Sequence, residues 1–345
     1  MAAPEKKVQV VGFPPEVQGP PKEVETDSEN EQDHREEPEV TGDEDEVVNV
    51  PDELDEEIQQ MLGYQHENEL YLDMSHMRIS SLKQLNLARF GDTLQRIDLR
   101  QNQIKHMSGK ELSHVPNLKE LDLYDNSIEH ISGLENLLEL ESLDLSFNNI
   151  RHISRISHLP KLETVYFVQN KIARVRPLDF QPPLTHCLIN LELGGNRLRS
   201  LENLSSLVNL EQLWIGKNKL TSLKLEGLET LTELEELYFS HNAVTELSGL
   251  ENNHKLSVLD LAANQVESFD GVQHLNLMSQ FYANDNKVKD LSVLDKYLSV
   301  QCMPELETLY VEGNPIQREL GTAYRRKVQL ILPQVRQLDA TLVRR

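Results

Sequence analysis

The chain repeats one pattern of apolar and polar positions along most of its length. Four consecutive segments align without a gap: LQRIDLRQNQI (94–104), LKELDLYDNSI (118–128), LESLDLSFNNI (140–150) and LETVYFVQNKI (162–172). The same pattern returns in LINLELGGNRL, LEQLWIGKNKL, LEELYFSHNAV, LSVLDLAANQV, MSQFYANDNKV and LETLYVEGNPI. With a degenerate first copy that ends near Ile79, the chain holds about eleven repeats. Such a series predicts a stack of similar coils that bury their apolar faces against one another.

The spacing inside one repeat predicts its local structure. Apolar residues at the fourth and sixth positions alternate with exposed ones, as in a short strand with one buried face. An asparagine follows, and its amide can satisfy the backbone groups of a sharp turn and of the neighbouring coil. Beyond it the apolar spacing becomes three, as in Ile128, Ile131, Leu134 and Leu137, which indicates a 3₁₀-like segment. The recurring asparagines, predicted to form a buried ladder, are Asn102, Asn126, Asn148, Asn170, Asn196, Asn218, Asn242, Asn264, Asn286 and Asn314.

The pattern LxxLxLxxNx(I/L/V) resembles the leucine-rich repeat family. The resemblance implies an α/β fold, a leucine-rich-repeat solenoid with a parallel β-sheet on its concave face and 3₁₀ or short helical segments on its convex face. We expect a disordered acidic tail over residues 1–50, a capping helix over 51–65, the repeats over 66–318 and the family's C-terminal cap over 319–345. Two longer repeats contain RPLDFQPP and DKYLSVQCMP, which we expect to bulge from the convex side or the edge without breaking the stack.

Charge is unevenly distributed along the chain. Residues 1–60 hold twenty Asp and Glu against four Lys and Arg, with too little apolar surface to offset the entropy of ordering. The net charge of −23 argues against binding to nucleic-acid phosphates, which lysine and arginine normally neutralise. No apolar run resembles a signal peptide or a membrane span, and Cys187 and Cys302 lack the spacing of a disulfide framework or a metal site. We therefore expect a soluble intracellular protein whose partners include neither nucleic acid nor membrane.

Sequence motifs of catalysis are missing. The chain has no phosphate-binding glycine loop, no nucleophile elbow and no HExxH metal motif. His106, His130 and His152 each fall four residues after a ladder asparagine; we interpret them as solvated side chains, with a metal or pH-sensing row as the alternative. We expect no enzyme activity, no catalytic residue, no metal and no cofactor.

The residues between the two apolar strand positions point out of the predicted sheet. All eleven are acidic or aromatic, although such residues make up about a fifth of the chain. Aromatic side chains supply large contact areas in protein interfaces, and carboxylates select lysine or arginine on a partner. Stacking on the sheet is the structural alternative for any single tyrosine. We call these eleven residues the acidic–aromatic row: Asp73, Asp98, Asp122, Asp144, Tyr166, Glu192, Trp214, Tyr238, Asp260, Tyr282 and Tyr310.

A closer resemblance rests on the stretches LDLYDNSIEHI, LYFSHNAV and LSGLENNHKL and on the ending YRRKVQLILPQVRQLDATLV. Over about residues 66–345 the chain is similar to the protein phosphatase 1 regulatory subunit 7 family, whose concave-face residues bind the catalytic subunit of that Ser/Thr phosphatase. Tyr166 and Trp214 stand where the family has Phe, Tyr282 where it has Trp, and Gln280 where it has Glu. With Tyr238 added from the row, the resemblance implies the partner-binding residues Asp144, Tyr166, Glu192, Trp214, Tyr238, Asp260, Gln280, Tyr282 and Tyr310.

This second resemblance implies a non-catalytic regulatory subunit that controls the activity, stability or localisation of the phosphatase in nucleus and cytoplasm, with a further inhibitor subunit as a third partner. Many phosphatase 1 partners use a short motif of a basic residue, Val or Ile, any residue, then Phe or Trp. The nearest stretch here, Arg174-Val175, continues into Arg176-Pro177, so binding is expected from the folded groove. The alternative is a leucine-rich-repeat scaffold in another complex, such as a spliceosomal ribonucleoprotein. An enzyme that uses the carboxylates of the row is a third hypothesis.

Overall fold

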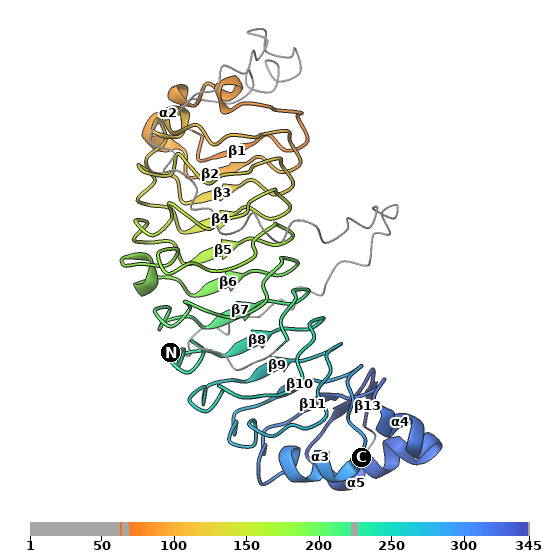
Figure 1. Ribbon diagram of the computed structural model, residues 1–345. Coiled ribbons are helices and arrows are strands. Elements are labelled where there is room, and N and C mark those ends of the chain that lie inside the picture. The colour runs from red at the N-terminus through yellow and green to blue at the C-terminus, as the bar shows by residue number, and fades with distance from the viewer. Residues whose placement is uncertain (1–62, 64–68, 222–226, 344–345) are drawn as a thin grey trace, which may run out of the picture. The chain divides into compact units, whose positions relative to one another are not determined.

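The computed structural model of the chain describes residue 63 and residues 69–221 and 227–343. In this part of the chain a single sheet holds all the strands, and they follow one another in chain order (Figure 1). The strands are β1 (Tyr71–Asp73), β2 (Arg96–Asp98), β3 (Glu120–Asp122), β4 (Ser142–Asp144), β5 (Thr164–Tyr166), β6 (Asn190–Glu192), β7 (Gln212–Trp214), β8 (Glu236–Tyr238), β9 (Val258–Asp260), β10 (Gln280–Tyr282), β11 (Thr308–Tyr310), β12 (Gln337–Leu338) and β13 (Thr341–Leu342). Neighbours pair in parallel up to β12, and only β12 and β13 pair antiparallel.

Helices are short and lie outside the sheet. The α-helices of the described residues are α2 (Gly109–Leu112), α3 (Leu291–Leu298), α4 (Pro315–Leu320) and α5 (Tyr324–Ile331). The 3₁₀ helices are η1 (Leu82–Leu85), η2 (Leu87–Arg89), η3 (Gly91–Thr93), η4 (Leu184–His186) and η5 (Gly321–Ala323). None of these helices is long and apolar enough to cross a membrane.

The core lies between the sheet and the opposite side of each coil. The central residue of each strand from β1 to β11 is at most 1% exposed, as Leu143 and Leu213 illustrate. On the opposite side the apolar residues spaced by three are joined by 3₁₀-type backbone bonds: the Leu137 N–H donates to the Leu134 carbonyl at 3.0 Å, and the Leu140 N–H donates to the Leu137 carbonyl at 3.1 Å. The predicted strand, turn and 3₁₀-like segment are thus confirmed, although most of these turns are isolated and do not extend into helices.

The hydrogen bonds of the predicted asparagine ladder are present at all ten positions, and the asparagines are buried except Asn218 and Asn242, which are half-buried. Each side-chain oxygen accepts from a backbone N–H of the preceding coil, and each amide nitrogen donates to a carbonyl of that coil. At Asn148 the partners are the Ile128 N–H at 2.9 Å and the Leu123 carbonyl at 3.0 Å. Because these backbone groups belong to turns, the amides replace hydrogen bonds that a helix or sheet would otherwise provide.

The residue before each ladder asparagine has a left-handed backbone conformation. This holds in all ten coils, from Gln101 (φ 54°) to Gly313 (φ 73°). Only two of the ten are glycines, and at Gly313 a Cβ atom would lie 2.1 Å from an Asp285 carboxylate oxygen. The left-handed conformation costs other residues roughly 1–2 kcal/mol, so the ladder hydrogen bonds hold the turn against this preference.

The two insertions leave the stack unbroken, since β5 pairs directly with β6 and β10 with β11. Their apolar residues divide between surface and core, since Leu178 and Val300 are 79% and 41% exposed. Phe180 is 1% exposed, and Tyr297 and Leu298 are 7% and 0% exposed, the last two on α3. These side chains join the core because the longer loops carry apolar area that is more stable out of water.

The C-terminal end of the stack is closed by α4, α5 and the β12–β13 pair (Figure 1). Asp339, which directly follows β12, caps the end of β11: its Oδ1 accepts from the Val311 N–H at 2.9 Å and the Glu312 N–H at 3.0 Å. The Tyr324 hydroxyl donates to the other Asp339 oxygen at 3.0 Å and ties α5 to the last coil. The predicted acidic tail and the N-terminal capping helix lie outside the described residues, apart from Gly63, and the predicted domain boundaries stay predictions.

Candidate functional site

The eleven residues of the acidic–aromatic row form one continuous line across the outer sheet face. Each is the register partner of the next along the parallel ladder, from Asp73 on β1 to Tyr310 on β11. Register alone therefore brings together eight of the nine predicted partner-binding residues. The ninth, Gln280, lies two residues before Tyr282 on β10 and so belongs to the neighbouring row.

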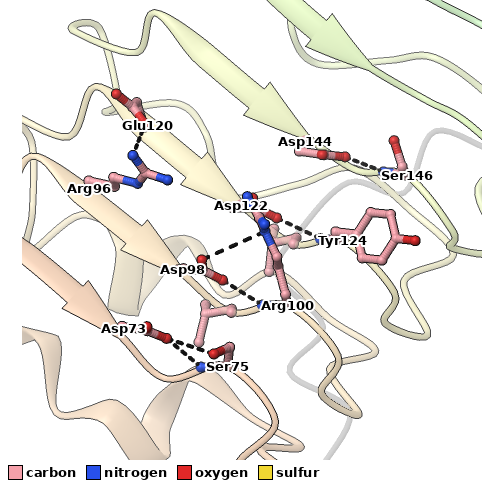
Figure 2. Close-up of polar contacts among 12 residues, drawn as sticks. Asp73, Ser75, Arg96, Asp98, Arg100, Glu120, Asp122, Tyr124, Asp144 and Ser146 are labelled. Atoms are coloured by element: carbon pink, nitrogen blue, oxygen red, sulfur yellow. Dashed lines mark hydrogen bonds and ion pairs between the residues drawn. The ribbon is translucent and has the colours of Figure 1, made fainter. Parts of the chain in front are cut away.

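The aspartates of the row also hold the ends of their own strands. The Asp144 carboxylate accepts from the Ser146 N–H at 2.8 Å, and the Asp260 carboxylate accepts from the Ala262 N–H at 2.9 Å. Figure 2 shows the same arrangement at the other aspartates of the first four strands. One carboxylate oxygen of each aspartate is thus used by the fold, and this local role explains part of the preference for aspartate.

Arg100 pairs with two acids near the N-terminal end of the row and offsets part of their charge. Its Nε atom lies 2.5 Å from an Asp122 oxygen and 3.6 Å from an Asp98 oxygen, and it bridges two neighbouring coils (Figure 2). Asp98 and Asp122 are only 6% and 9% exposed. These two carboxylates lie in the row as expected, but a cation of the same chain already pairs with them. Sequence reasoning missed Arg100, which stands out as the only cation two positions after a row residue.

Asp144, Tyr166 and Glu192 lie side by side on β4, β5 and β6. Burial, opposed by hydrogen bonds from Ser146, raises the pKa of Asp144 to about 6. Burial, together with the nearby Asp144 charge, raises the pKa of Glu192 to about 7. Among the described residues, no donor forms a hydrogen bond to the Glu192 carboxylate. A desolvated acid in this state gains most from a cation brought by another molecule.

A shallow hollow of about 260 Å³ opens on the sheet face between β2 and β5. The hollow lies between the Arg100 ion pairs and the first predicted partner-binding residues, since Asp122, Asp144 and Tyr166 all line it. The hollow carries both signs of charge and ring surface, which suits a polar protein segment better than an apolar small molecule.

The second half of the row is an aromatic surface. The Trp214 and Tyr238 rings are stacked with centroids 5.4 Å apart and planes 4° apart, and the Tyr282 and Tyr310 centroids are 5.2 Å apart. Rings in such pairs are already ordered, so little side-chain entropy is lost when a partner covers them. The structural alternative, stacking on the sheet, thus applies to these four residues. The same stacking keeps their rings ordered for contact with a partner.

Two of the tyrosine hydroxyl groups form hydrogen bonds within their own strands. The Tyr238 hydroxyl donates to Glu236 at 2.9 Å, and the Tyr282 hydroxyl donates to Gln280 at 2.7 Å. Gln280 therefore positions a ring of the row, in addition to any contact with a partner. Glu236 does the same for Tyr238 and was missed from the sequence, where only its spacing of two from the tyrosine could have indicated it.

Replacing Glu192 with glutamine is expected to raise the free energy of unfolding at pH 8 and to leave it nearly unchanged at pH 4. The ordinary pKa of 4.5 rises to about 7 in the folded protein. Between these values the unfolded chain ionises while the folded protein keeps its proton, so the wild type loses stability as pH rises from 4.5 to 7. With partial exposure discounted, the difference at pH 8 is about 2 kcal/mol.

Urea unfolding of both proteins at the two pH values measures this difference. Glu211→Gln, on an exposed residue, is the matched control and should change little at either pH. A stabilisation by Glu192→Gln that is equally large at pH 4 would show that the burial of the charge is not its cause.

The remaining candidate groups lie apart from the row. The described residues contain no cluster of three or more His, Cys, Asp or Glu side chains able to hold a metal ion. Cys187 and Cys302 are free thiols, and Cys187 Sγ donates to the Leu162 carbonyl at 3.4 Å. His106 and His130 are exposed, in agreement with their interpretation as solvated side chains.

Comparisons with known proteins agree with this architecture. Leucine-rich-repeat family models match residues 70–128, 92–140 and 232–274. The solved structure of a leucine-rich-repeat protein from Leptospira interrogans superposes with a TM-score of 0.63 at 20% identity, covering 80% of this chain and 79% of that one. At this identity the match shows the fold alone. The leucine-rich-repeat solenoid predicted from the sequence is confirmed.

Some of the curated relatives carry phosphatase names, while others are named only as leucine-rich-repeat-containing proteins. Protein phosphatase 1 regulatory subunit SDS22 of Schizosaccharomyces pombe is 39% identical over 69 residues, which is 20% of each chain. Human protein phosphatase 1 regulatory subunit 7 is 62% identical over 39 residues, 11% of this chain and 10% of that one. The resemblance to this family is confirmed over these stretches, which are much shorter than residues 66–345. The alignments span a fifth or less of these relatives' lengths.

Proposed function

We propose that this chain, a leucine-rich-repeat protein similar over short stretches to protein phosphatase 1 regulatory subunits, is a non-catalytic regulatory subunit of Ser/Thr protein phosphatase 1. It binds the catalytic subunit through the outer sheet face and controls the activity, stability or localisation of that enzyme. The proposed contact residues are Asp144, Tyr166, Glu192, Trp214, Tyr238, Asp260, Gln280, Tyr282 and Tyr310.

The observation that carries the proposal is the half-buried carboxylate of Glu192, placed in register between the rings of Tyr166 and Trp214 and without a cation beside it among the described residues. Partly removing this acid from water costs free energy that no described residue offsets, whereas Arg100 pairs with Asp98 and Asp122 at the other end of the row. A partner lysine or arginine supplies the missing charge, and the rings supply the contact area around it.

A role without catalysis is supported by the repeat architecture and by the names of the relatives. The folded sheet face, and not a linear motif, is the proposed contact, since Val175 in the nearest motif-like stretch is only 3% exposed. We further propose that the complex occurs in nucleus and cytoplasm and accommodates an inhibitor subunit as a third component.

Affinity capture of the intact chain from a cell extract, washed in high salt, tests the proposal. The expected result is that the phosphatase 1 catalytic subunit stays bound, and that purified catalytic subunit binds the purified chain directly. Glu192→Gln should weaken this direct binding about tenfold or more, since a charge pair in a desolvated contact is lost. Capture of spliceosomal proteins, with no direct phosphatase binding, would favour the scaffold alternative instead.

A further inference from the structure

Phe147 occupies a backbone position for which its side chain is poorly suited. It is the residue before ladder Asn148, and its φ of 56° is left-handed. The equivalent residues of the other nine coils are Gln101, Asp125, Gln169, Gly195, Lys217, His241, Ala263, Asp285 and Gly313. All of these are polar, small or glycine, the types that tolerate this conformation best, and Phe147 is the only bulky apolar residue among them.

Burial does not explain the phenylalanine. Its side chain is 42% exposed, so much of the ring faces solvent although the backbone around it is fixed. The Phe147 N–H donates to the Val168 carbonyl at 2.7 Å, which continues the sheet pairing beyond β4. The ladder imposes this conformation in every coil, so the fold accounts for the backbone but not for the choice of a large, partly exposed ring at this position.

Phe147 forms a pair with Tyr124 of the preceding coil. Their ring centroids are 4.9 Å apart and the planes are tilted by 47°. Tyr124 follows the end of β3 and Phe147 follows the end of β4, so the pair lies at the edge of the sheet next to Asp144 (Figure 2 shows the Tyr124 side). We call Tyr124, Asp125 and Phe147 the rim cluster.

Negative charge surrounds this ring pair. Asp125 occupies in its coil the place that Phe147 has in the next, and its own N–H donates to the Ser146 carbonyl at 2.9 Å. Burial raises the pKa of Tyr124, and the Asp125, Asp144 and Asp122 charges raise it further, so these carboxylates lie near the phenol. Arg100, the neighbouring cation that acts in the opposite direction, is itself paired with Asp122 and Asp98.

We propose that the rim cluster binds a lysine or arginine side chain of the partner protein, which extends the partner's footprint from Asp144 over the edge of the sheet. The apolar stem of that side chain covers the Phe147 ring, and its positive head meets the ring face and the Asp125 carboxylate. A purely apolar partner side chain would leave Asp125 and Asp144 uncompensated. This inference rests on the proposed phosphatase-binding function.

Phe147→Asn separates binding from folding. Asparagine tolerates the left-handed conformation, so the variant should unfold at the same temperature as the wild type or at a higher one. Its affinity for purified phosphatase 1 catalytic subunit should fall about tenfold. Gln169→Asn, at the equivalent position of the next coil (φ 53°), is the matched control and should leave the affinity unchanged. Wild-type affinity in Phe147→Asn would overturn the inference.

A second measurement does not depend on the phosphatase. In a titration with a tetra-arginine peptide followed by NMR, the ring signals of Tyr124 and Phe147 should shift, and Asp125→Asn should reduce the shift severalfold. Rings that do not respond to the peptide would overturn the rim cluster even if the phosphatase binds. If the wild type fails to bind the phosphatase while the rings respond, the proposed function fails and the basic-side-chain site stands.

Discussion

Trp214→Ala is expected to weaken the complex with the phosphatase 1 catalytic subunit by roughly 2–4 kcal/mol, or about 30-fold to 1000-fold in Kd. Trp214 lies at the centre of the acidic–aromatic row, between the Glu192 carboxylate and the Tyr238 ring. Its removal takes away the largest ring of the surface and leaves Tyr238 without its stacking partner. The fold should persist, because the core at β7 is formed by the fully buried Leu213.

Calorimetric titration of the variant against purified catalytic subunit measures the effect, with circular dichroism as the check on folding. Trp214→Phe is the matched control, since a phenylalanine keeps a ring against Tyr238 and should retain affinity within a few fold. Trp214 is the single tryptophan of the chain, so its fluorescence reports docking in the wild type directly. Unchanged affinity in Trp214→Ala would remove the outer sheet face as the docking surface.

Asn148→Ala is expected to lower the free energy of unfolding by about 3–5 kcal/mol, because it removes a side chain that satisfies buried backbone groups in two coils. The Asn148 oxygen accepts from the Ile128 N–H, and its amide nitrogen donates to the carbonyls of Leu123 and Leu145 at 3.0 and 3.1 Å. Alanine leaves these groups without partners in a place that water reaches poorly, since Asn148 is only 6% exposed.

Urea unfolding compares this variant with Asn209→Ala. Asn209 also bonds across coils, with its amide donating to the His186 carbonyl at 2.9 Å, but it is exposed and water can replace its bond. Asn209→Ala should therefore cost less than about 1 kcal/mol. If the two substitutions proved equally mild, the ladder would be a result of the fold and not a cause of its stability.

The outer sheet face carries some groups that lower the stability of the isolated protein and others that raise it. Glu192 and Phe147 each lower the stability of the isolated protein, one by a partly desolvated charge and the other by a left-handed backbone. Arg100 favours stability in the same sheet by pairing with acids that would otherwise be available to a partner. Along the row, Glu192 lies on one side of Asp144 without a cation, and the acids paired with Arg100 lie on the other side. This is the arrangement expected of a binding site that ends near Asp144.

The sequence by itself determined the repeating coil, the asparagine ladder and the alignment of the acidic–aromatic row. These features follow from local periodicity: once coils of similar length stack in parallel, register places equivalent residues such as Asp144, Tyr166 and Glu192 side by side. The leucine pattern also determined the core, because each strand contributes its central side chain to the same interior. No contact between distant residues has to be known for this reasoning.

Only the tertiary structure decided which residues of the row are already paired within the chain. Side-chain direction decides the hydrogen bond from Tyr238 to Glu236 within β8. Direction and the spacing between coils together decide that Arg100 pairs with Asp122 and that the Phe147 ring contacts the Tyr124 ring. The buried apolar residues of the two insertions depend on the same geometry. A sequence period fixes which positions are neighbours, but charge compensation and strain depend on distances of a few ångströms, and folding alone sets those distances.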